Sequence, residues 1–324
     1  MGGRGTRREG YPSMADISAK ISAVIPVYNT PPAYLQQCIE SVLAQQIYSC
    51  QVILVDDGSN EQTAQLCNQF AKESEKIIVV HQKNAGPGVA RNTGLQQVQG
   101  EYLTFVDADD TLCPSTWRYV LERMAAQNAD CAIFGWLDNE AGTPQEIRVS
   151  DVETVMRGAD TQTAIAGDDR ACGGGYLWNK IWRTDGLRDA NTGKIPEFIS
   201  DLFTYEDKEW VLRALNNAKK VLLLPEIFYD YRFVAQSLTK EKASDARRQY
   251  EAYRAHDRIL ENLAPVNSEA YRAAAQFYFD RCWRDLWRQI RHFPKYKMKR
   301  CKKTFQCLCK MCVFVMRYTN TNSI

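Results

Sequence analysis

Short apolar segments alternate with segments of helical periodicity across residues 21–136, and this alternation limits the possible folds more than any single motif. Each apolar segment is hydrophobic throughout rather than at every second residue, which indicates a strand buried on both faces. The intervening helices would cover those faces, so the pattern predicts an α/β fold with a mixed, mostly parallel sheet flanked by helices. The predicted strands are residues 21–27, 52–55, 77–80, 102–106 and 131–136.

Polar side chains follow four of these strands where each strand ends. They are Tyr28-Asn29, Asp56-Asp57, Asn84, and Asp107 with Asp109. The carboxyl ends of parallel strands meet at one edge of a sheet, and the ligands of open α/β sheets bind outside that edge. We therefore expect these side chains to form one ligand site. The alternative is that each group only caps a neighbouring helix, which needs four separate coincidences.

The stretch EYLTFVDADD, residues 101–110, is the most unusual of these strand ends, because a buried strand runs directly into three carboxylates. Asp107, Asp109 and Asp110 repel one another, and a divalent cation between the first two would relieve that repulsion. Mg²⁺ or Mn²⁺ is commonly held by one or two carboxylates together with the phosphates of a substrate. An acidic turn that caps a helix is the alternative.

Phosphate recognition would depend on such a metal ion, because the sequence lacks the two common nucleotide-binding loops. Neither G-x-G-x-x-G after the first strand nor the P-loop pattern G-x-x-x-x-G-K-[ST] is present. Arg91, on the helix predicted after the turn at residues 84–88, would add a positive charge at the site. An arginine on the solvated face of a helix is the alternative.

Residues 138–175 interrupt the alternation, since they are polar and Gly-rich and contain Gly173-Gly174-Gly175. Long segments without secondary structure are usually functional or disordered, so we expect a mobile lid that is most mobile at these glycines. After this segment the sequence predicts two short strands separated by Pro225. From Ser244 onward it predicts two helices.

Charge is distributed unevenly along the chain. The net charge is +2, which does not indicate a nucleic-acid partner. Ten Lys and Arg residues and no acidic residue follow Asp285, whereas residues 1–285 hold 31 basic and 39 acidic side chains, a net charge of −8. This basic tail predicts that residues 295–317 attach the protein to an anionic membrane surface. Packing of the tail on the domain, or in a homodimer, is the alternative.

Cysteine usage bears on the cellular compartment. The 11 cysteines are scattered, and the chain has no secretory signal. This is typical of a reducing cytoplasm, where cysteine behaves as a small hydrophobe. Together with the basic tail, it predicts a cytoplasmic protein held peripherally on the inner face of the cell membrane. Residues 1–20 are Gly- and Arg-rich without periodicity, and we expect a disordered leader there.

Seven motifs give the sequence a family resemblance. They are IPVYN (25–29), VDDGS (55–59), NAGPGVARNTGL (84–95), FVDADD (105–110), WNKIWR (178–183), EDKEW (206–210) and YDYRFVAQSLT (229–239). In this order and spacing they resemble the family-2 glycosyltransferases of the GT-A fold. The resemblance implies a Rossmann-like GT-A catalytic domain over residues 21–239, and leaves residues 240–324 as a C-terminal helical region with the basic tail.

The resemblance also implies an activity, namely inverting transfer of a hexosyl group from a UDP-sugar to a hydroxyl of a glycan or lipid-linked glycan. Asp109 and Asp107 would hold Mn²⁺ or Mg²⁺, and Asp207 matches the catalytic base, with Glu206 as its rival. Arg183 matches a position near the diphosphate or the acceptor. The residues expected to bind the nucleotide sugar are Pro26, Val27, Tyr28, Asn29, Asp56, Asp57, Asn84, Arg91, Asp107, Ala108, Asp109 and Lys180.

The proposed base begins a predicted helix. The positive end of the helix dipole favours a carboxylate there, so we expect a lowered pKa and an ionised Asp207 at neutral pH. One carboxylate on the face opposite the diphosphate suffices to take the proton of the acceptor hydroxyl. Capping of the helix start is the structural alternative for both Asp207 and Glu206.

Two other functions fit part of this pattern. A sugar nucleotidyltransferase typically carries a Gly-rich basic loop after its first strand, whereas this chain has Tyr28-Asn29-Thr30-Pro31 at that position. A non-catalytic nucleotide-sugar binding protein would show donor affinity without hydrolysis or transfer, so turnover of a UDP-sugar separates it from an enzyme.

Overall fold

The computed structural model describes residues 20–45, 47, 49–139, 142–189, 192–232, 246–291 and 309. The predicted leader up to residue 19, the predicted domain boundary after residue 239 and the basic segment at residues 295–317 lie outside the described residues. Within the described part of the chain, no helix is long and apolar enough to cross a bilayer.

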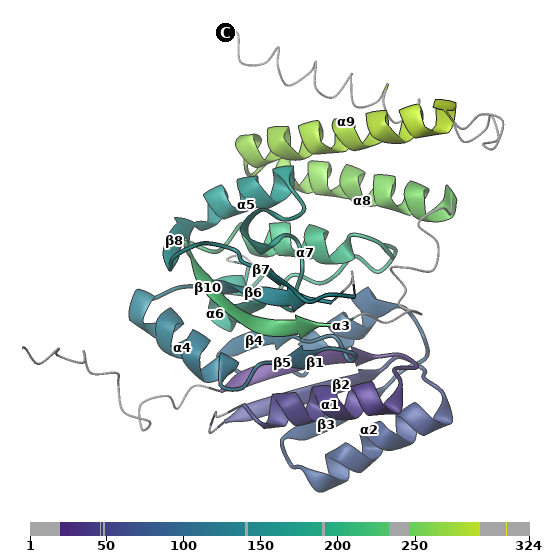
Figure 1. Ribbon diagram of the computed structural model, residues 1–324, viewed down its shortest axis with the longest axis vertical. Coiled ribbons are helices and arrows are strands. Elements are labelled where there is room, and N and C mark those ends of the chain that lie inside the picture. The colour runs from purple at the N-terminus through teal and green to yellow at the C-terminus, as the bar shows by residue number, and fades with distance from the viewer. Residues whose placement is uncertain are drawn as a thin grey trace, which may run out of the picture.

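The strands form one mixed sheet at the centre of the molecule (Figure 1). They are β1 (Ile21–Val27), β2 (Cys50–Asp56), β3 (Ile77–His81), β4 (Tyr102–Phe105), β5 (Thr111–Leu112), β6 (Cys131–Asp138), β7 (Gln145–Ile147), β8 (Thr154–Arg157), β9 (Lys180–Arg183) and β10 (Lys220–Tyr231). Their order is β3-β2-β1-β4-β9-β6-β10-β5, with β7 paired to β6 and β8 to β10. The predicted mixed, mostly parallel sheet is confirmed.

Strand direction decides which loops lie together. β3, β2, β1 and β4 are parallel neighbours. β9 runs antiparallel to both β4 and β6, and β6 is parallel to β10. Two reversals restore the direction, so β6 and β10 end at the same edge as β1 to β4. This carboxyl edge is where an open α/β sheet binds its ligand.

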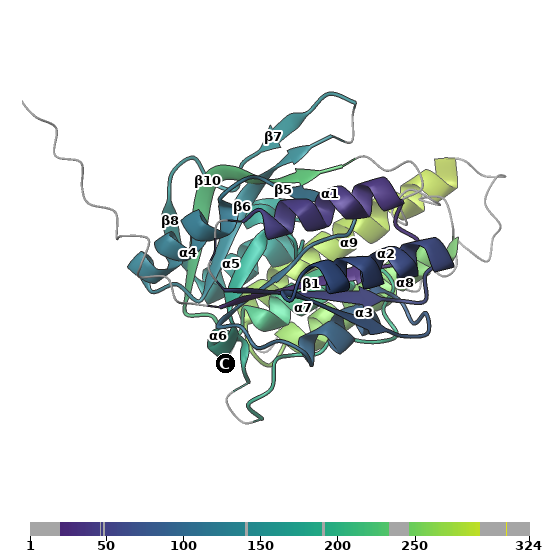
Figure 2. The same cartoon turned by 90° about the horizontal axis from the view of Figure 1, so that it is seen from below.

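Helices cover both faces of the sheet. They are α1 (Pro32–Leu43), α2 (Glu61–Glu73), α3 (Pro87–Leu95), α4 (Thr116–Gln127), α5 (Gly158–Gly167), α6 (Thr184–Leu187), α7 (Glu206–Ala214), α8 (Ala246–Leu263) and α9 (Ser268–Arg291), with a 3-10 turn, η1, at Ala171–Gly173. Figures 1 and 2 show α8 and α9 stacked outside α5 and α7, on the side of the sheet away from α1 and α2. The predicted C-terminal helical extension is thus a third layer over α5 and α7.

The apolar strands fill two cores because successive residues of a strand point to opposite faces. In β1, Val24 belongs to the core under α3, α7, α8 and α9. Ala23 and Ile25 belong to the core under α1, α2 and α4. This explains why these strands are apolar throughout instead of alternating.

Two neighbouring residues at the start of α2 have different roles. Asn60 is the N-cap, and its side chain accepts a hydrogen bond of 3.0 Å from the amide of Thr63. The Ser59 hydroxyl instead accepts from the amide of Asn29 at 3.1 Å. The serine therefore joins the loop after β2 to the loop after β1.

Residues 138–175 are not the unstructured segment that the sequence predicted, since they contain β7, β8, α5 and η1, while the mobility of a lid there stays a prediction. β7 and β8 lack the continuous apolar sequence of the central strands, because they lie at the periphery of the sheet with exposed side chains. Gly173, Gly174 and Gly175 are buried. Gly174 has φ 62°, and a Cβ there would lie 2.2 Å from the carbonyl oxygen of Asp169, so only glycine fits this turn.

The two strands expected on either side of Pro225 form one strand, β10. The register of its pairing with β6 shifts between Leu224 and Ile227. Such an irregularity accommodates a proline, which has no amide hydrogen to donate to the ladder.

Candidate functional site

The loops after β1, β2 and β3 form one connected unit at the carboxyl edge. The Asn29 side-chain oxygen accepts from the amide of Asn60 at 2.8 Å. The Asp57 carboxylate accepts from the amides of Ala85 and Gly86 at 2.8 and 2.9 Å. Gly86, with φ 91°, begins α3 in a backbone conformation that favours glycine. These contacts fix the loops and leave the ring of Tyr28 about half exposed beside them.

Asp56 also makes contacts within these connected loops. Its carboxylate accepts from the amide of Ser59 at 2.9 Å and lies 2.7 Å from Nδ1 of His81. Burial acts to raise the pKa of Asp56, but the hydrogen bonds from Ser59 and His81 outweigh it and hold that pKa below its ordinary value. Asp56 is therefore ionised at neutral pH and nearly fully buried.

Residues 107–110, which follow β4, form the acidic turn, and the carboxylate of Asp110 fixes its position. Asp110 is buried and accepts from the hydroxyl of Tyr229 at 2.9 Å and from the amide of Arg232 at 2.8 Å. The same Tyr229 hydroxyl accepts from the amide of Asp107 at 3.1 Å. Asp110 thus ties the turn to β10, while Asp107 and Asp109 remain partly exposed at the edge of the sheet.

These carboxylates crowd one another. Burial, followed by the charge of Asp107, raises the pKa of Asp109 to about 6. Burial and then the charges of Asp107 and Asp109 raise the pKa of Asp110 well above its ordinary value. Repulsion among the three acids, expected from the sequence, is therefore present in the structure.

Arg91 connects this turn to the start of α7. It is 8% exposed, so the alternative of a solvated helix arginine is wrong. It donates to Glu206 at 3.1 Å and to Asp107 at 3.5 Å, and its guanidinium carbon lies 5.6 Å from the centre of the Phe198 ring. One cation therefore holds carboxylates from β4 and α7 side by side.

Asp207 is the second residue of α7, and its pKa differs from expectation. Its carboxylate accepts from the amide of Lys208 at 2.7 Å. Burial, with the neighbouring charge of Glu206, raises the pKa of Asp207 to about 7, although Arg91 opposes the shift. The prediction of a pKa lowered by the helix dipole is wrong, because burial and like charge outweigh a dipole effect of about 1 kcal/mol.

Lys180 is buried, whereas Arg183 does not lie where the resemblance placed it. Lys180 has no exposed surface, and its ammonium donates to the carbonyl oxygens of Gly174 at 2.9 Å and Tyr176 at 2.7 Å. It stabilises the glycine turn, and its contact with a nucleotide sugar stays a prediction. Arg183 pairs with Tyr102 at the opposite edge of the sheet, because β9 runs antiparallel to β4.

The other predicted residues lie at or directly beneath the carboxyl edge. Asn84 is exposed, Val27 and Ala108 are buried, and Pro26 is partly exposed in β1. The sequence interpretation gave no role to Tyr229, although the motif at residues 229–239 contains it. Only the structure shows that its hydroxyl bridges Asp107 and Asp110.

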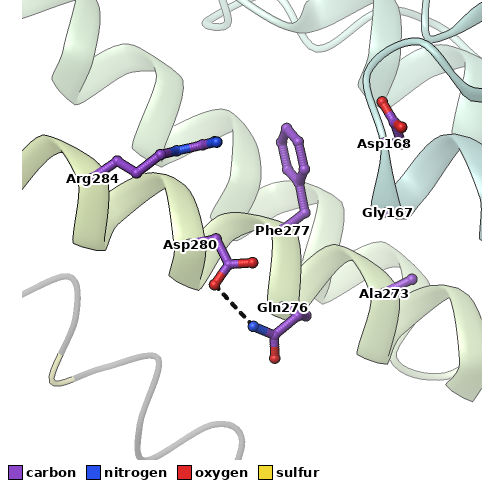
Figure 3. Close-up of a pocket in the computed structure, with 7 residues that line it drawn as sticks. All are labelled: Gly167, Asp168, Ala273, Gln276, Phe277, Asp280 and Arg284. Carbon is purple, nitrogen blue, oxygen red and sulfur yellow. Dashed lines mark hydrogen bonds between the residues drawn. The ribbon is translucent and has the colours of Figure 1, made fainter.

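The described residues form a larger cavity beside α9 and a smaller one at the carboxyl edge. The larger, of about 500 Å³, lies between the end of α5 and the face of α9 (Figure 3). It is lined by Gly167, Asp168, Ala273, Gln276, Phe277, Asp280 and Arg284, and none of the residues predicted to bind the donor takes part. The smaller, of about 80 Å³, lies at the carboxyl edge between β6, β7 and β10.

Comparison with known proteins identifies the family. The sequence model of glycosyl transferase family 2 matches residues 22–199, more than half of the chain, including the strands β1 to β4 and the acidic turn. This chain belongs to glycosyl transferase family 2.

This family-2 glycosyltransferase is similar to named bacterial proteins. It is 30% identical over 224 residues to the uncharacterized glycosyltransferase EpsJ of Bacillus subtilis, covering 68% of this chain and 63% of EpsJ, less than two thirds of that protein. It is 27% identical over 241 residues to the putative teichuronic acid biosynthesis glycosyltransferase TuaG of the same organism, covering 74% of this chain and 89% of TuaG.

Solved structures show the same fold. S. aureus TarS 1–349 in complex with UDP matches with a TM-score of 0.62 at 22% identity, over 80% of this chain and 70% of that one. The mannosyltransferase PcManGT from Pyrobaculum calidifontis, in complex with GDP-Man and Mn²⁺, matches with a TM-score of 0.54 at 14% identity, over 91% and 86% of the two chains. The predicted GT-A type fold is confirmed.

Proposed function

We propose that this family-2 glycosyltransferase transfers a hexosyl group from a UDP-sugar to a hydroxyl of a glycan or lipid-linked glycan, with inversion at the anomeric carbon. The observation that carries the proposal is the link across the carboxyl edge, where Arg91 joins Asp107 of the acidic turn to Glu206 at the start of α7. In this proposal the acidic turn binds the donor and the start of α7 supplies the carboxylate base, and Arg91 holds the two near each other.

The nucleotide would occupy the connected loops after β1, β2 and β3. Hydrogen bonds already fix Asn29 and Asp57 there, so little conformational entropy is lost when a donor binds. The exposed ring of Tyr28 offers a surface for a base. The complexes of TarS with UDP and with UDP-GlcNAc support a uridine nucleotide. This site suits a nucleotide-sugar donor, as the family requires, and not the Gly-rich loop chemistry of a sugar nucleotidyltransferase.

A divalent ion fits the acidic turn. Asp109 has its pKa raised to about 6 by burial and by Asp107, and a cation would remove that penalty. Within the described residues no group of three or more His, Cys, Asp or Glu side chains is arranged for a metal, so Asp107 and Asp109 would supply two ligands and the donor phosphates the others. When bound, Mn²⁺ or Mg²⁺ would supply Lewis-acid stabilisation of the diphosphate leaving group. The Mn²⁺ complex of the mannosyltransferase supports this choice.

Asp207 is the residue that we assign as general base. Its neighbour Glu206 is paired with Arg91, whereas the Asp207 carboxylate accepts, within the described part of the chain, a local hydrogen bond from the amide of Lys208. A pKa of about 7 suits a general base at neutral pH better than the low value expected from the sequence. Removal of the hydroxyl proton by Asp207, on the side away from the diphosphate, would give inversion in one displacement.

The names of the relatives support a product class. TuaG is named for teichuronic acid biosynthesis, which supports a role for this chain in polysaccharide biosynthesis. A peripheral position at the inner face of the membrane would bring the enzyme to a lipid-linked acceptor. We retain that location as a proposal that depends on residues 295–317.

The test is turnover of a panel of UDP-sugars, measured as release of UDP in Mn²⁺ and in EDTA. We expect slow, metal-dependent hydrolysis of one donor and faster turnover when a hydroxyl acceptor is added. Donor binding without any turnover in the wild-type protein would instead assign a nucleotide-sugar binding protein. The Asp207→Asn variant controls for hydrolysis by contaminating enzymes.

A further inference from the structure

Two tryptophans of α9 are exposed on the outer layer of the molecule. Trp283 and Trp287 are 47% and 49% exposed, whereas the other five tryptophans of the chain are at most 6% exposed. α9 is the outermost helix over α5 and α7 (Figures 1 and 2). Contact of two large indole rings with water is unfavourable, so a partner that covers both would be stabilised by their burial.

The two indoles belong to one row along α9. Residues four apart are neighbours on the same side of a helix, which places Phe279, Trp283 and Trp287 in line. The Phe279 ring packs against the core and stacks on Trp283 with ring centres 6.4 Å apart. Trp283 meets Trp287 edge to face at 6.0 Å. The row is therefore fixed to the core at Phe279 and exposed at Trp283 and Trp287.

The charge around the exposed indoles is positive. Residues 281–291 contain four arginines and one acid. The arginines with exposed side chains are Arg284, Arg288 and Arg291. The acid, Asp285, is only 14% exposed and lies 3.4 Å from Arg288. The sequence after α9 continues this charge, since six of residues 295–303 are Lys or Arg.

This half of α9 lies on the side of the carboxyl edge. Arg281, two residues before Trp283, donates to the hydroxyl of Tyr205, which directly precedes α7. The other half of α9 lies against the end of α5, since a Cβ on Gly167 would lie 3.1 Å from the Cβ of Ala273. A flat surface that covers the exposed indoles therefore meets the molecule on the side where the proposed reaction takes place.

The combination of indoles and arginines selects the partner. Tryptophan favours the boundary between lipid headgroups and acyl chains, because its ring is apolar and its N–H donates a hydrogen bond. Arg and Lys add attraction to anionic headgroups. A second copy of the chain matches less well, because two-fold pairing of this face would bring arginines of like charge together. The basic tail matches less well for the same reason.

We propose that the C-terminal half of α9 docks on an anionic lipid surface, with Trp283 and Trp287 inserted at the level of the headgroups and the exposed arginines beside lipid phosphates. This surface goes beyond the proposed transfer reaction and is distinct from the basic tail at residues 295–317. The tail would attract the protein to the membrane, and the indoles would fix which face of the molecule meets it. The carboxyl edge is then held close to the lipid surface.

Tryptophan fluorescence of the full chain tests the proposal, because the two exposed indoles are the ones that a bilayer can reach. Vesicles of phosphatidylcholine and phosphatidylglycerol in equal parts, at low salt, should shift the wild-type emission to shorter wavelength. Lipids brominated in the acyl chain should quench part of that emission, since interfacial helices bury their apolar face by ~5–10 Å. Vesicles of phosphatidylcholine alone should cause neither change.

Matched variants separate the contributions of ring and charge. Trp287→Ala should weaken binding to the mixed vesicles about ten-fold, whereas Val266→Ala, an exposed apolar residue before α9, should not. Arg291→Gln should weaken binding about five-fold, as expected for one charge near an anionic surface. Arg188→Gln, which removes an exposed arginine directly after α6, is the control for charge.

Three results with the wild-type protein would overturn the proposal, so it stays falsifiable even if a variant does not fold. The first is the absence of binding to anionic vesicles. The second is sedimentation with those vesicles without quenching by brominated lipid, which would leave the tail as the contact. The third is emission that acrylamide cannot quench before vesicles are added, because a second copy or the tail would then cover the indoles.

Donor turnover is measured separately, as release of UDP without vesicles. Its absence in the wild type would refute the proposed function and leave the docking surface standing. Loss of vesicle binding in Trp287→Ala, with turnover of the donor unchanged, would support a docking surface that is separate from the active site.

Discussion

Replacing Asp109 by asparagine should stabilise the metal-free protein while it removes metal-dependent donor binding. Burial and the charge of Asp107 raise the pKa of Asp109 from 3.8 to about 6. Two pKa units correspond to about 3 kcal/mol at 1.36 kcal/mol per unit. Because the side chain is partly exposed, solvent screening reduces this figure, and we expect a gain of ~1–2 kcal/mol at pH 7.5.

The pH dependence of stability shows whether ionisation of Asp109 favours or opposes folding. A carboxyl group whose pKa is raised in the folded state favours folding in its protonated form, so that stability is present near pH 4 and is lost as pH rises through about 6. Asparagine cannot ionise, so the advantage of Asp109→Asn should be small at pH 4, roughly half developed at pH 5 and complete at pH 7.5. For a chain of this size the final gain corresponds to a rise in Tm of ~2–4 °C.

Urea denaturation in EDTA at pH 5 and pH 7.5 measures the free energy of unfolding. Calorimetry in Mn²⁺ and in EDTA measures the affinity for UDP. The wild type should bind UDP at least ten-fold more tightly with Mn²⁺, and Asp109→Asn should lose that difference. Asp151→Asn, an exposed acid away from the acidic turn, should change neither quantity. A variant that is no more stable at pH 7.5 than at pH 5, relative to the wild type, would refute the electrostatic argument, and retained metal dependence would remove Asp109 from the metal site.

Three further predictions concern the base and the tail. Asp207→Asn should lower transfer by ~10²–10⁴-fold with UDP affinity nearly unchanged, and a larger loss in Glu206→Gln would move the base to Glu206. Transfer by the wild type should rise with pH through about 7, because Asp207 must lose its proton to act as base, and a flat rate from pH 5 to 8 would contradict this. Deleting residues 295–317 should abolish sedimentation with anionic vesicles at low salt, and an unchanged sedimented fraction would favour the alternative of packing on the domain or in a dimer.

The sequence predicted the carboxyl edge of the sheet well because the signal is local. Each apolar segment and the polar residue that follows it are neighbours in the chain, and parallel strands bring such ends together without further information. Tyr28, Asp57 and Asp109 could therefore be assigned to one edge from their positions alone. The structure confirms that edge, while their contacts with a donor stay a prediction.

Properties set by distant partners could not be predicted. The sequence left two interpretations of Arg91 open, a charge at the site or a solvated helix residue, because its partner Glu206 lies 115 positions later in the chain. Arg183 was misplaced because nothing in WNKIWR states that its strand runs antiparallel to β4. The pKa of Asp207 was misjudged for the same reason, since the sequence shows the helix start but not its burial.

The placement of the base depends on elements outside the span that defines the family. Tyr205 and Lys208 flank Glu206 and Asp207, and both contact α9, which lies beyond residue 199 where the family match ends. The Tyr205 hydroxyl donates to Asp169 at 3.1 Å and accepts from Arg281.

The ammonium of Lys208 donates to Asp169 at 2.7 Å and lies 4.3 Å from the centre of the Phe277 ring of α9. The first turn of α7 is therefore held from behind by the C-terminal helices, while Arg91 holds it from the side of the acidic turn. A change in α9 would therefore shift Asp207 and Glu206 without touching the loops after β1 to β3.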